Sequence, residues 1–193
     1  FAVSTWNEII NASGSNFGES EQAFADIGFV IDSSGSMDRN DPSGYRKTAA
    51  KRFVDALLQK DRASVVGFDD GIVERTAVTG DRTIIDDAIS GIGPYGGTNI
   101  AEGIGASVTE LTEASNADKR GQAIILLTDG QNDAGFGGPS ETSLDEQTRE
   151  AARRAAANNI TIYTIGLGDA DTSLLQEVSS ITNGSFETIS SAE

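Results

Sequence analysis

The sequence has no cysteine and no histidine. Without cysteine the chain can form no disulfide, no thiolate zinc site and no cysteine nucleophile. Without histidine it lacks the usual general base near neutral pH, the imidazole metal ligand and the Ser-His-Asp triad. No apolar run approaches the roughly 20 residues needed to cross a bilayer, so membrane insertion is not expected. These absences exclude many of the common catalytic centres.

Basic residues are also scarce. Fourteen Lys and Arg stand against 30 Asp and Glu, which gives a net charge of −16 and a pI of about 4.2. Such a surface repels phosphate backbones and anionic headgroups, so nucleic acid is not an expected partner. Cations and basic partners suit it better. The acidic, lysine-poor composition favours an extracellular or cell-surface location, with an intracellular one as the alternative.

The length and apolar content fit one domain. The 193 residues are 37% hydrophobic, which is enough for a core of ordinary size. Residues 1–22 begin with a short apolar stretch and continue with Ser, Asn, Gly and Glu, which is typical of an end strand or a linker from a preceding region. We therefore expect the domain to span residues 23–193. The abrupt start suggests a segment of a longer protein, so the expectation is a monomeric domain within a larger chain.

Strand-like and helix-like segments alternate along the chain. Compact apolar runs predict strands buried on both faces at residues 27–31, 123–127 and 160–165. A hairpin is expected where residues 63–68 and 72–78 flank a tight Asp-Asp-Gly turn, and a last strand is expected at 185–189. Apolar stripes predict helices at residues 44–59, 81–92, 100–111, 141–157 and 172–181. The fold class is therefore α/β, with a doubly wound, mostly parallel sheet and helices on both faces.

Polar side chains follow the buried strands, at the edge where open parallel sheets bind ligands. Asp32, Ser34 and Ser36 follow the first strand at alternate positions, so an extended backbone can point all three the same way. Asp129 follows the run at residues 123–127, and Thr98 lies just before a helix. We expect these five side chains to gather at one end of the sheet.

Such a set of ligands suits a hard divalent cation. Oxygen donors without nitrogen or sulfur select a hard cation such as Mg²⁺, Mn²⁺ or Ca²⁺. Two aspartates only balance a divalent charge, and the hydroxyls are neutral. A carboxylate from outside the chain could therefore complete the shell of the ion.

The same residues resemble the metal-ion-dependent adhesion site (MIDAS) of von Willebrand factor type A (VWA) domains. The resemblance rests on VIDSSGSM, GGTNI and LLTDG in this order, and it covers about residues 24–191. It implies a Rossmann-like sheet of six strands in the order 3-2-1-4-5-6, with strand 3 antiparallel. It also implies that the hydroxyls of Ser34, Ser36 and Thr98 bind the ion directly, while Asp32 and Asp129 act largely through water.

The resemblance further implies a protein-binding or adhesion module rather than an enzyme. Its partner would be a protein or glycoprotein that offers an acidic residue to the metal. In the family a final helix usually follows the last strand, whereas this sequence ends at Glu193. We therefore expect that helix to be truncated or missing.

Other interpretations stay open. The chain could be a Mg²⁺- or Mn²⁺-dependent phosphoryl hydrolase, or a structural spacer module of a large surface protein. The polar loop over residues 129–140 faintly resembles a calcium loop but is interpreted as solvated. Asp38, Asn40 and Asp41 are interpreted as turn residues and as residues at a helix N-terminus. Contacts at the rim of the site or an extra cation site are the alternatives.

Overall fold

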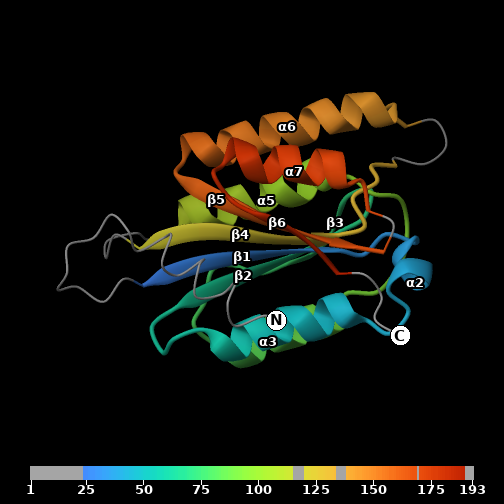
Figure 1. Ribbon diagram of the computed structural model, residues 1–193. Helices are drawn as coiled ribbons and strands as arrows, with labels where there is room; N and C mark the ends of the chain where they lie inside the picture. Colours follow the sequence, from blue (N-terminus) through green and yellow to red (C-terminus); the bar gives the residue numbers. More distant parts are fainter. Residues whose placement is uncertain (1–23, 115–119, 134–137, 169, 190–193) are drawn as a thin grey trace.

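The computed structural model describes residues 24–114, 120–133, 138–168 and 170–189 (Figure 1). The expected strand or linker over residues 1–22 lies outside this part. One sheet of six strands is covered by helices on both faces. Its strands are β1 (Ala25–Asp32), β2 (Arg62–Phe68), β3 (Ile72–Arg75), β4 (Gly121–Thr128), β5 (Ile160–Leu167) and β6 (Phe186–Ile189). The helices are α2 (Met37–Asn40), α3 (Tyr45–Ala56), α4 (Arg82–Gly91), α5 (Ile100–Glu113), α6 (Glu141–Ala157) and α7 (Thr172–Ile181).

The strand order is β3-β2-β1-β4-β5-β6. Each neighbouring pair is parallel except β2 and β3, so the order and the one antiparallel strand confirm the expected fold. The hairpin strand ends at Arg75, earlier than predicted. There the hydroxyl of Thr76 accepts the hydrogen bond of the Val65 amide at 2.9 Å, so a side chain replaces the backbone partner.

The core has two layers, one on each face of the sheet. Phe29 of β1 packs in the layer under α3 and α4, and its neighbour Val30 packs in the layer under α5, α6 and α7. Figure 1 shows α3 below the sheet and α5, α6 and α7 above it. All eight residues of β1 are buried, because the strand is central and both of its faces are covered. This double burial explains why the strand sequences show no polar alternation.

A buried carboxylate lies at the amino end of β1. Asp26 is fully buried and accepts hydrogen bonds from Arg62 Nη2 at 2.6 Å and from Arg120 Nε at 2.6 Å. Two guanidinium groups therefore compensate one carboxylate, as burial of a charge requires. This end of the sheet is held together by its own ion pairs.

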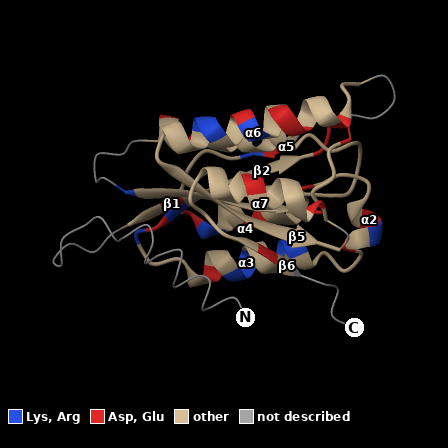
Figure 2. Ribbon diagram, turned by 45° about the horizontal axis from the view of Figure 1, so that its top comes forward, with Lys and Arg blue, Asp and Glu red and all other residues tan. Residues whose placement is uncertain are grey.

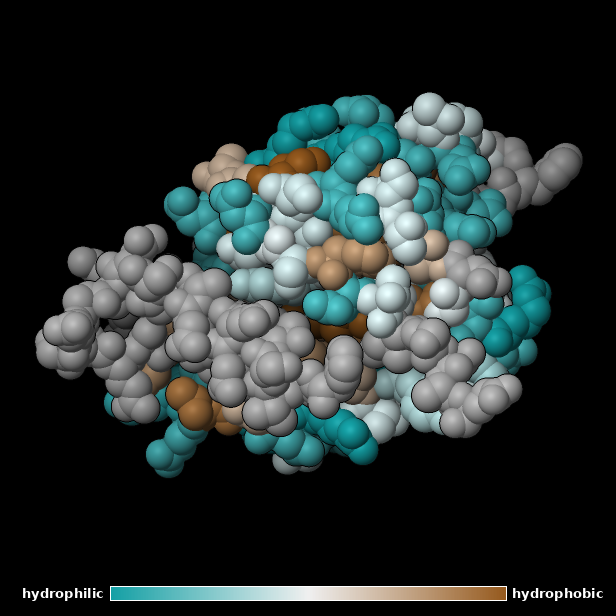
Figure 3. All heavy atoms as spheres, viewed as in Figure 1, coloured by the Kyte–Doolittle hydropathy of each residue, from teal (hydrophilic) through white to brown (hydrophobic). Residues whose placement is uncertain are grey.

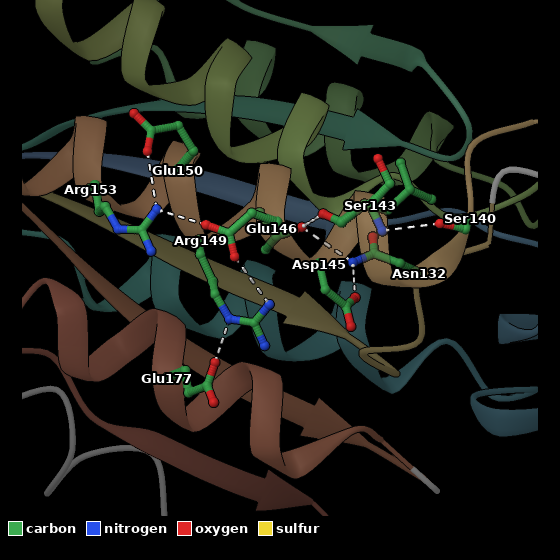
Figure 4. A network of polar contacts seen from close by, with 11 residues as sticks. Asn132, Ser140, Ser143, Asp145, Glu146, Arg149, Glu150, Arg153 and Glu177 are labelled. Carbon is green, nitrogen blue, oxygen red and sulfur yellow. Dashed lines mark hydrogen bonds and ion pairs between the residues drawn. The ribbon is translucent and has the colours of Figure 1, made fainter.

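The described surface is mostly polar. Figure 3 shows hydrophilic residues over most of the described part of one face, with small separate apolar areas. Between α6 and α7, Arg149 Nε lies 2.6 Å from Glu177 Oε2 (Figure 4). Within α6, Arg153 forms ion pairs with Glu146 and Glu150. Such exposed pairs stabilise a fold only slightly. None of the described helices is both long enough and apolar enough to cross a membrane.

Candidate metal centre

The first three predicted residues come together at the carboxyl end of β1. Asp32 is the last residue of the strand and is fully buried. The amide of Ser34 donates a hydrogen bond to Asp32 Oδ1 at 2.7 Å, which turns the chain back over the carboxylate. The hydroxyl oxygens of Ser34 and Ser36 lie 2.9 Å apart. The DxSxS segment thus gathers one carboxylate and two hydroxyls within a single turn.

Asp129 joins them from the next strand. It directly follows β4, which pairs with β1, and only 2% of its surface is exposed. Asn40 Nδ2 donates to Asp129 Oδ2 at 3.0 Å. The other oxygen, Asp129 Oδ1, is buried and has no hydrogen-bond partner among the described residues. Burial, and secondarily the charge of Asp129, raise the pKa of Asp32 to about 6. The two carboxylates are therefore close enough to repel each other.

Thr98 is brought to this end by its backbone. It is buried in the loop before α5, where Asp133 N donates to Thr98 O at 2.9 Å. The carbonyl of Gly96, two residues earlier, accepts from the amide of Gly35 at 3.1 Å. The loop before α5 is thus tied both to the DxSxS segment and to the loop after β4. The structure brings all five predicted residues to one end of the sheet.

Two glycines allow these loops to meet. Gly96 has a φ of +71°, and a Cβ there would lie 2.9 Å from Asp69 Oδ2 and 2.8 Å from Asp70 Oδ1. Gly130 has a φ of +74°, and a Cβ there would lie 3.1 Å from the backbone nitrogen of Asp171. Both positions require a left-handed backbone and a missing side chain. In the GGT and TDG motifs the glycine is therefore required for the backbone conformation, while the threonine and the aspartate supply polar atoms.

Two further residues support the site. Thr128 had no role in the sequence interpretation, whereas a contact of Asn40 at the rim of the site was the alternative interpretation. The Thr128 hydroxyl donates to Asp32 Oδ2 at 2.5 Å, so both oxygens of that carboxylate accept hydrogen bonds. Asn40 belongs to α2 and orients Asp129. The signal for Thr128 was its place between the buried strand and Asp129. The sequence placed Asn40 near the site but did not identify Asp129 as its partner, because the two residues are 89 positions apart.

The interpretation of the loop after β4 as solvated is wrong for Asn132. This side chain is 4% exposed, accepts from the amide of Ile100 at 3.1 Å, and donates to Asp145 and Thr148 (Figure 4). It thereby joins the loop to the first residue of α5 and to α6. Residues 134–137 of the same loop lie outside the described part.

The donor set consists of two carboxylates and three hydroxyls. In the described part of the chain, no Lys or Arg forms an ion pair with Asp32 or Asp129. Nor does a group of three or more Asp or Glu side chains converge there. Two buried carboxylates without a basic partner, one of them with an unpartnered oxygen, fit a small hard cation.

Comparison with protein families agrees with the fold. The model of the von Willebrand factor type A domain matches residues 26–193. An uncharacterized protein of Synechocystis sp., sll0103, is 31% identical over 164 residues, which are 83% of this chain and 36% of that protein. Inter-alpha-trypsin inhibitor heavy chain H2 of Mus musculus is 32% identical over 166 residues, which are 81% of this chain and 17% of that protein. The chain thus spans a minor part of the length of these relatives.

Solved structures share the architecture. The vWF domain of the type V pili tip protein Mfa5 from Porphyromonas gingivalis has a TM-score of 0.70 at 16% identity, covering 89% of this chain and 91% of that one. The pilus adhesin SpaC from Lactobacillus rhamnosus GG, in its open conformation, has a TM-score of 0.67 at 18% identity, covering 87% of this chain and 28% of that one. Together with the family match and the strand order, this shows that the chain belongs to the von Willebrand factor type A domain family.

Proposed function

We propose that this domain is a metal-dependent protein-binding and adhesion module. In this proposal Asp32, Ser34, Ser36, Thr98 and Asp129 hold a divalent cation, with Mg²⁺ as the first choice and Mn²⁺ or Ca²⁺ as alternatives. An acidic group of a protein or glycoprotein partner completes the shell of the ion. The observation that carries the proposal is the buried Oδ1 of Asp129, which has no hydrogen-bond partner among the described residues.

The cost of burying charge supports a cation at this place. A buried carboxylate without a counter-charge is unfavourable by several kcal/mol, roughly the scale measured when one partner of a buried ion pair is removed. The fold accepts two such carboxylates side by side, as the raised pKa of Asp32 reflects. A divalent cation would compensate both of them at once.

The contacts also suggest a different role for each ligand at the cation. Both oxygens of Asp32 already accept hydrogen bonds, from Ser34 N and Thr128 Oγ1, so this residue would contribute its charge and orient water. Asp129 Oδ1 is the carboxylate oxygen left for the ion or for its water. The hydroxyls add donor oxygens without charge. A bound cation would therefore stay electrophilic and attract an anionic ligand.

The kind of partner follows from the relatives and from the chemistry. Mfa5 is described as a pilus tip protein and SpaC as a pilus adhesin. We propose by analogy that this domain is a monomeric module of a larger extracellular or surface protein. An enzymatic role is not part of the proposal, because phosphoryl hydrolysis needs a general base or a second metal beside the first. No third carboxylate joins the two aspartates in the described part of the chain.

A titration of Mg²⁺ followed by calorimetry tests the proposal. Wild type should bind the ion, and Asp129→Ala should weaken binding by about tenfold or more, the scale of one charge-assisted contact. Asp87→Ala, which removes an exposed carboxylate from α4, is the matched control and should bind like wild type. Equal affinities of wild type and Asp129→Ala would remove Asp129 from the site. A wild type that binds none of Mg²⁺, Mn²⁺ and Ca²⁺ would overturn the proposal.

A further inference from the structure

We propose that Tyr95 and Asp70 form a second contact surface beside the metal centre, called here the Tyr95 patch. It would receive a Lys or Arg side chain that the partner carries close to its metal-binding carboxylate. This inference rests on the proposed function, because the cation fixes where the partner carboxylate lies. It goes further by assigning a specificity residue and a charge pattern to the partner.

The exposure of Tyr95 is the first observation. Its exposed fraction is 80%, the highest among the large hydrophobic side chains of the described residues. Most of a tyrosine is apolar surface, and aromatic side chains on binding surfaces often carry a large share of the affinity. A single exposed tyrosine is ordinary, but this one lies in the loop that also supplies Thr98. It therefore flanks the place where the partner carboxylate would bind.

The backbone around Tyr95 is held firmly. Its amide donates to the carbonyl of Ser33 at 2.6 Å, and the next carbonyl, that of Gly96, accepts from Gly35. On the other side Ile92 is buried in the core, and its carbonyl accepts from Lys47 Nζ at 2.9 Å. The ring is thus presented on a loop that is already ordered. Little backbone entropy would be lost when a partner packs against it.

Two carboxylates lie against the same loop. The Cβ position of Gly96, the residue after Tyr95, is 2.8 Å from Asp70 Oδ1 and 2.9 Å from Asp69 Oδ2. Asp70 is exposed and forms no ion pair with a Lys or Arg of the described residues. Asp69 is only 5% exposed, and its Oδ1 accepts from the amide of Gly71 at 2.9 Å, so Asp69 adds charge beneath the surface and no contact atom. An exposed aromatic ring on a loop that an exposed, unpaired carboxylate approaches is a combination that can bind a guanidinium or ammonium group, by cation–π attraction and by ion pairing.

The distribution of charge over the domain supports the same partner. Figure 2 shows red segments in the loops near α2, although α2 itself also carries a blue segment at Arg39. At the opposite end of the sheet Arg62 and Arg120 pair with Asp26. A partner with an isolated carboxylate would be repelled by this acidic rim until it reached the ion. A basic neighbour on the partner removes that repulsion and matches the rim. The occupant that fits is therefore an exposed segment in which an Asp or Glu lies near a Lys or Arg.

Selection from a random peptide library displayed on phage tests the inference. Phage bind to immobilised wild-type domain in Mg²⁺ and are eluted with EDTA, so that only metal-dependent clones are collected. The expected clones contain an Asp or Glu with a Lys or Arg nearby, above the frequency of the unselected library. Synthetic peptides from these clones should bind Tyr95→Ala about tenfold more weakly or worse, whereas Tyr95→Phe keeps the ring and most of the affinity. Asp70→Asn should lower the preference for the basic residue.

Leu58→Ala is the control, because Leu58 is also an exposed apolar residue but lies beside Asp61 at the amino end of β1. It should bind the peptides like wild type. The Mg²⁺ affinity of Tyr95→Ala should also match wild type, which separates this inference from the proposed function. Clones that have an acidic residue but no basic enrichment, the absence of any EDTA-eluted clone, or full peptide binding by Tyr95→Ala would each overturn the Tyr95 patch. A wild type that binds none of Mg²⁺, Mn²⁺ and Ca²⁺ would overturn both proposals.

Discussion

Asn40 Nδ2 donates a hydrogen bond to Asp129 Oδ2 across 3.0 Å, which joins α2 to the loop after β4. The bond fixes one oxygen of the carboxylate and leaves Oδ1 as the oxygen without a partner among the described residues. Gly168 supports the contact, because a Cβ there would lie 3.1 Å from Asn40 Cβ. A residue outside the ligand set thus controls the orientation of one of its two charges.

Replacing Asn40 should weaken the metal centre without unfolding the domain. Residues that orient a ligand typically affect metal affinity by about 10- to 100-fold. We expect Asn40→Ala to lower Mg²⁺ affinity toward the lower end of that range in calorimetry. Asn158→Ala removes a comparable amide that donates to the carbonyl of Arg154 at the exposed end of α6, and it should leave affinity unchanged. An unaltered affinity of Asn40→Ala would show that Asp129 needs no orientation.

The pKa of Asp32 predicts how stability depends on pH in EDTA. Its folded-state pKa of about 6 lies above the ordinary value of 3.8, so the folded state binds the proton more tightly than the unfolded state. The free energy of unfolding should therefore rise as pH falls through about 6, with a contribution of up to roughly 3 kcal/mol from this group. Urea unfolding at several pH values measures it.

Two comparisons isolate the contribution of Asp32. Asp32→Asn should lose this part of the pH dependence, while the titration of the other carboxylates persists. Saturating Mg²⁺ should reduce the dependence as well, because the cation favours the ionised carboxylate and the proton competes with it. A pH profile identical in wild type and Asp32→Asn would mean that the folded-state pKa of Asp32 is ordinary.

Gly130→Ala should destabilise the loop after Asp129. The φ of +74° and the 3.1 Å approach of a Cβ to Asp171 N predict a loss of about 1–3 kcal/mol in the free energy of unfolding. Gly80→Ala is the matched control, since a Cβ there meets nothing within 4 Å and its φ is not positive. Its free energy of unfolding should change by less than about 1 kcal/mol. A similar loss in both variants would contradict the backbone argument.

Removing Arg120 should destabilise the opposite end of the sheet strongly. Asp26 is fully buried, so the loss of one of its two guanidinium partners leaves part of its charge uncompensated. We expect Arg120→Met to lower the free energy of unfolding by about 3–5 kcal/mol. Arg153→Met, at an exposed pair on α6, should cost far less than Arg120→Met, because solvent screens the pair. Thermal or urea unfolding of the two variants gives the comparison, and equal effects would contradict it.

The strands of the sheet could be predicted well because each central strand is a continuous apolar run in the sequence. Central strands are covered on both faces, so segments such as 123–127 are apolar throughout and easy to recognise. The helix over residues 141–157 has the predicted bounds, since a Ser140 N-cap starts it. The hairpin strand was predicted too long, because its end depends on one hydroxyl of Thr76 that pairs with the neighbouring strand.

The candidate site was predictable as far as its residues follow strand ends. The positions of Asp32 and Asp129 at one edge follow from parallel neighbouring strands, and the structure places them so. The supporting amides were not predictable in the same way. Asn40 was expected at the rim only as an alternative, and Asn132 was expected in a solvated loop. Their partners lie 89 and 32 positions away, so the local sequence does not identify them.

The central strand β1 has a buried carboxylate at each end, and the two are compensated differently. Asp26 is neutralised from within the chain by two arginines, whereas no Lys or Arg of the described residues pairs with Asp32. If the proposed cation supplies the missing charge, an ion taken up from solution compensates Asp32 in place of a basic side chain. A ligand at about 100 times its dissociation constant adds about 2.7 kcal/mol to the folded state. The domain would then unfold more readily in cation-depleted surroundings than in cation-rich ones, whether or not any partner is bound.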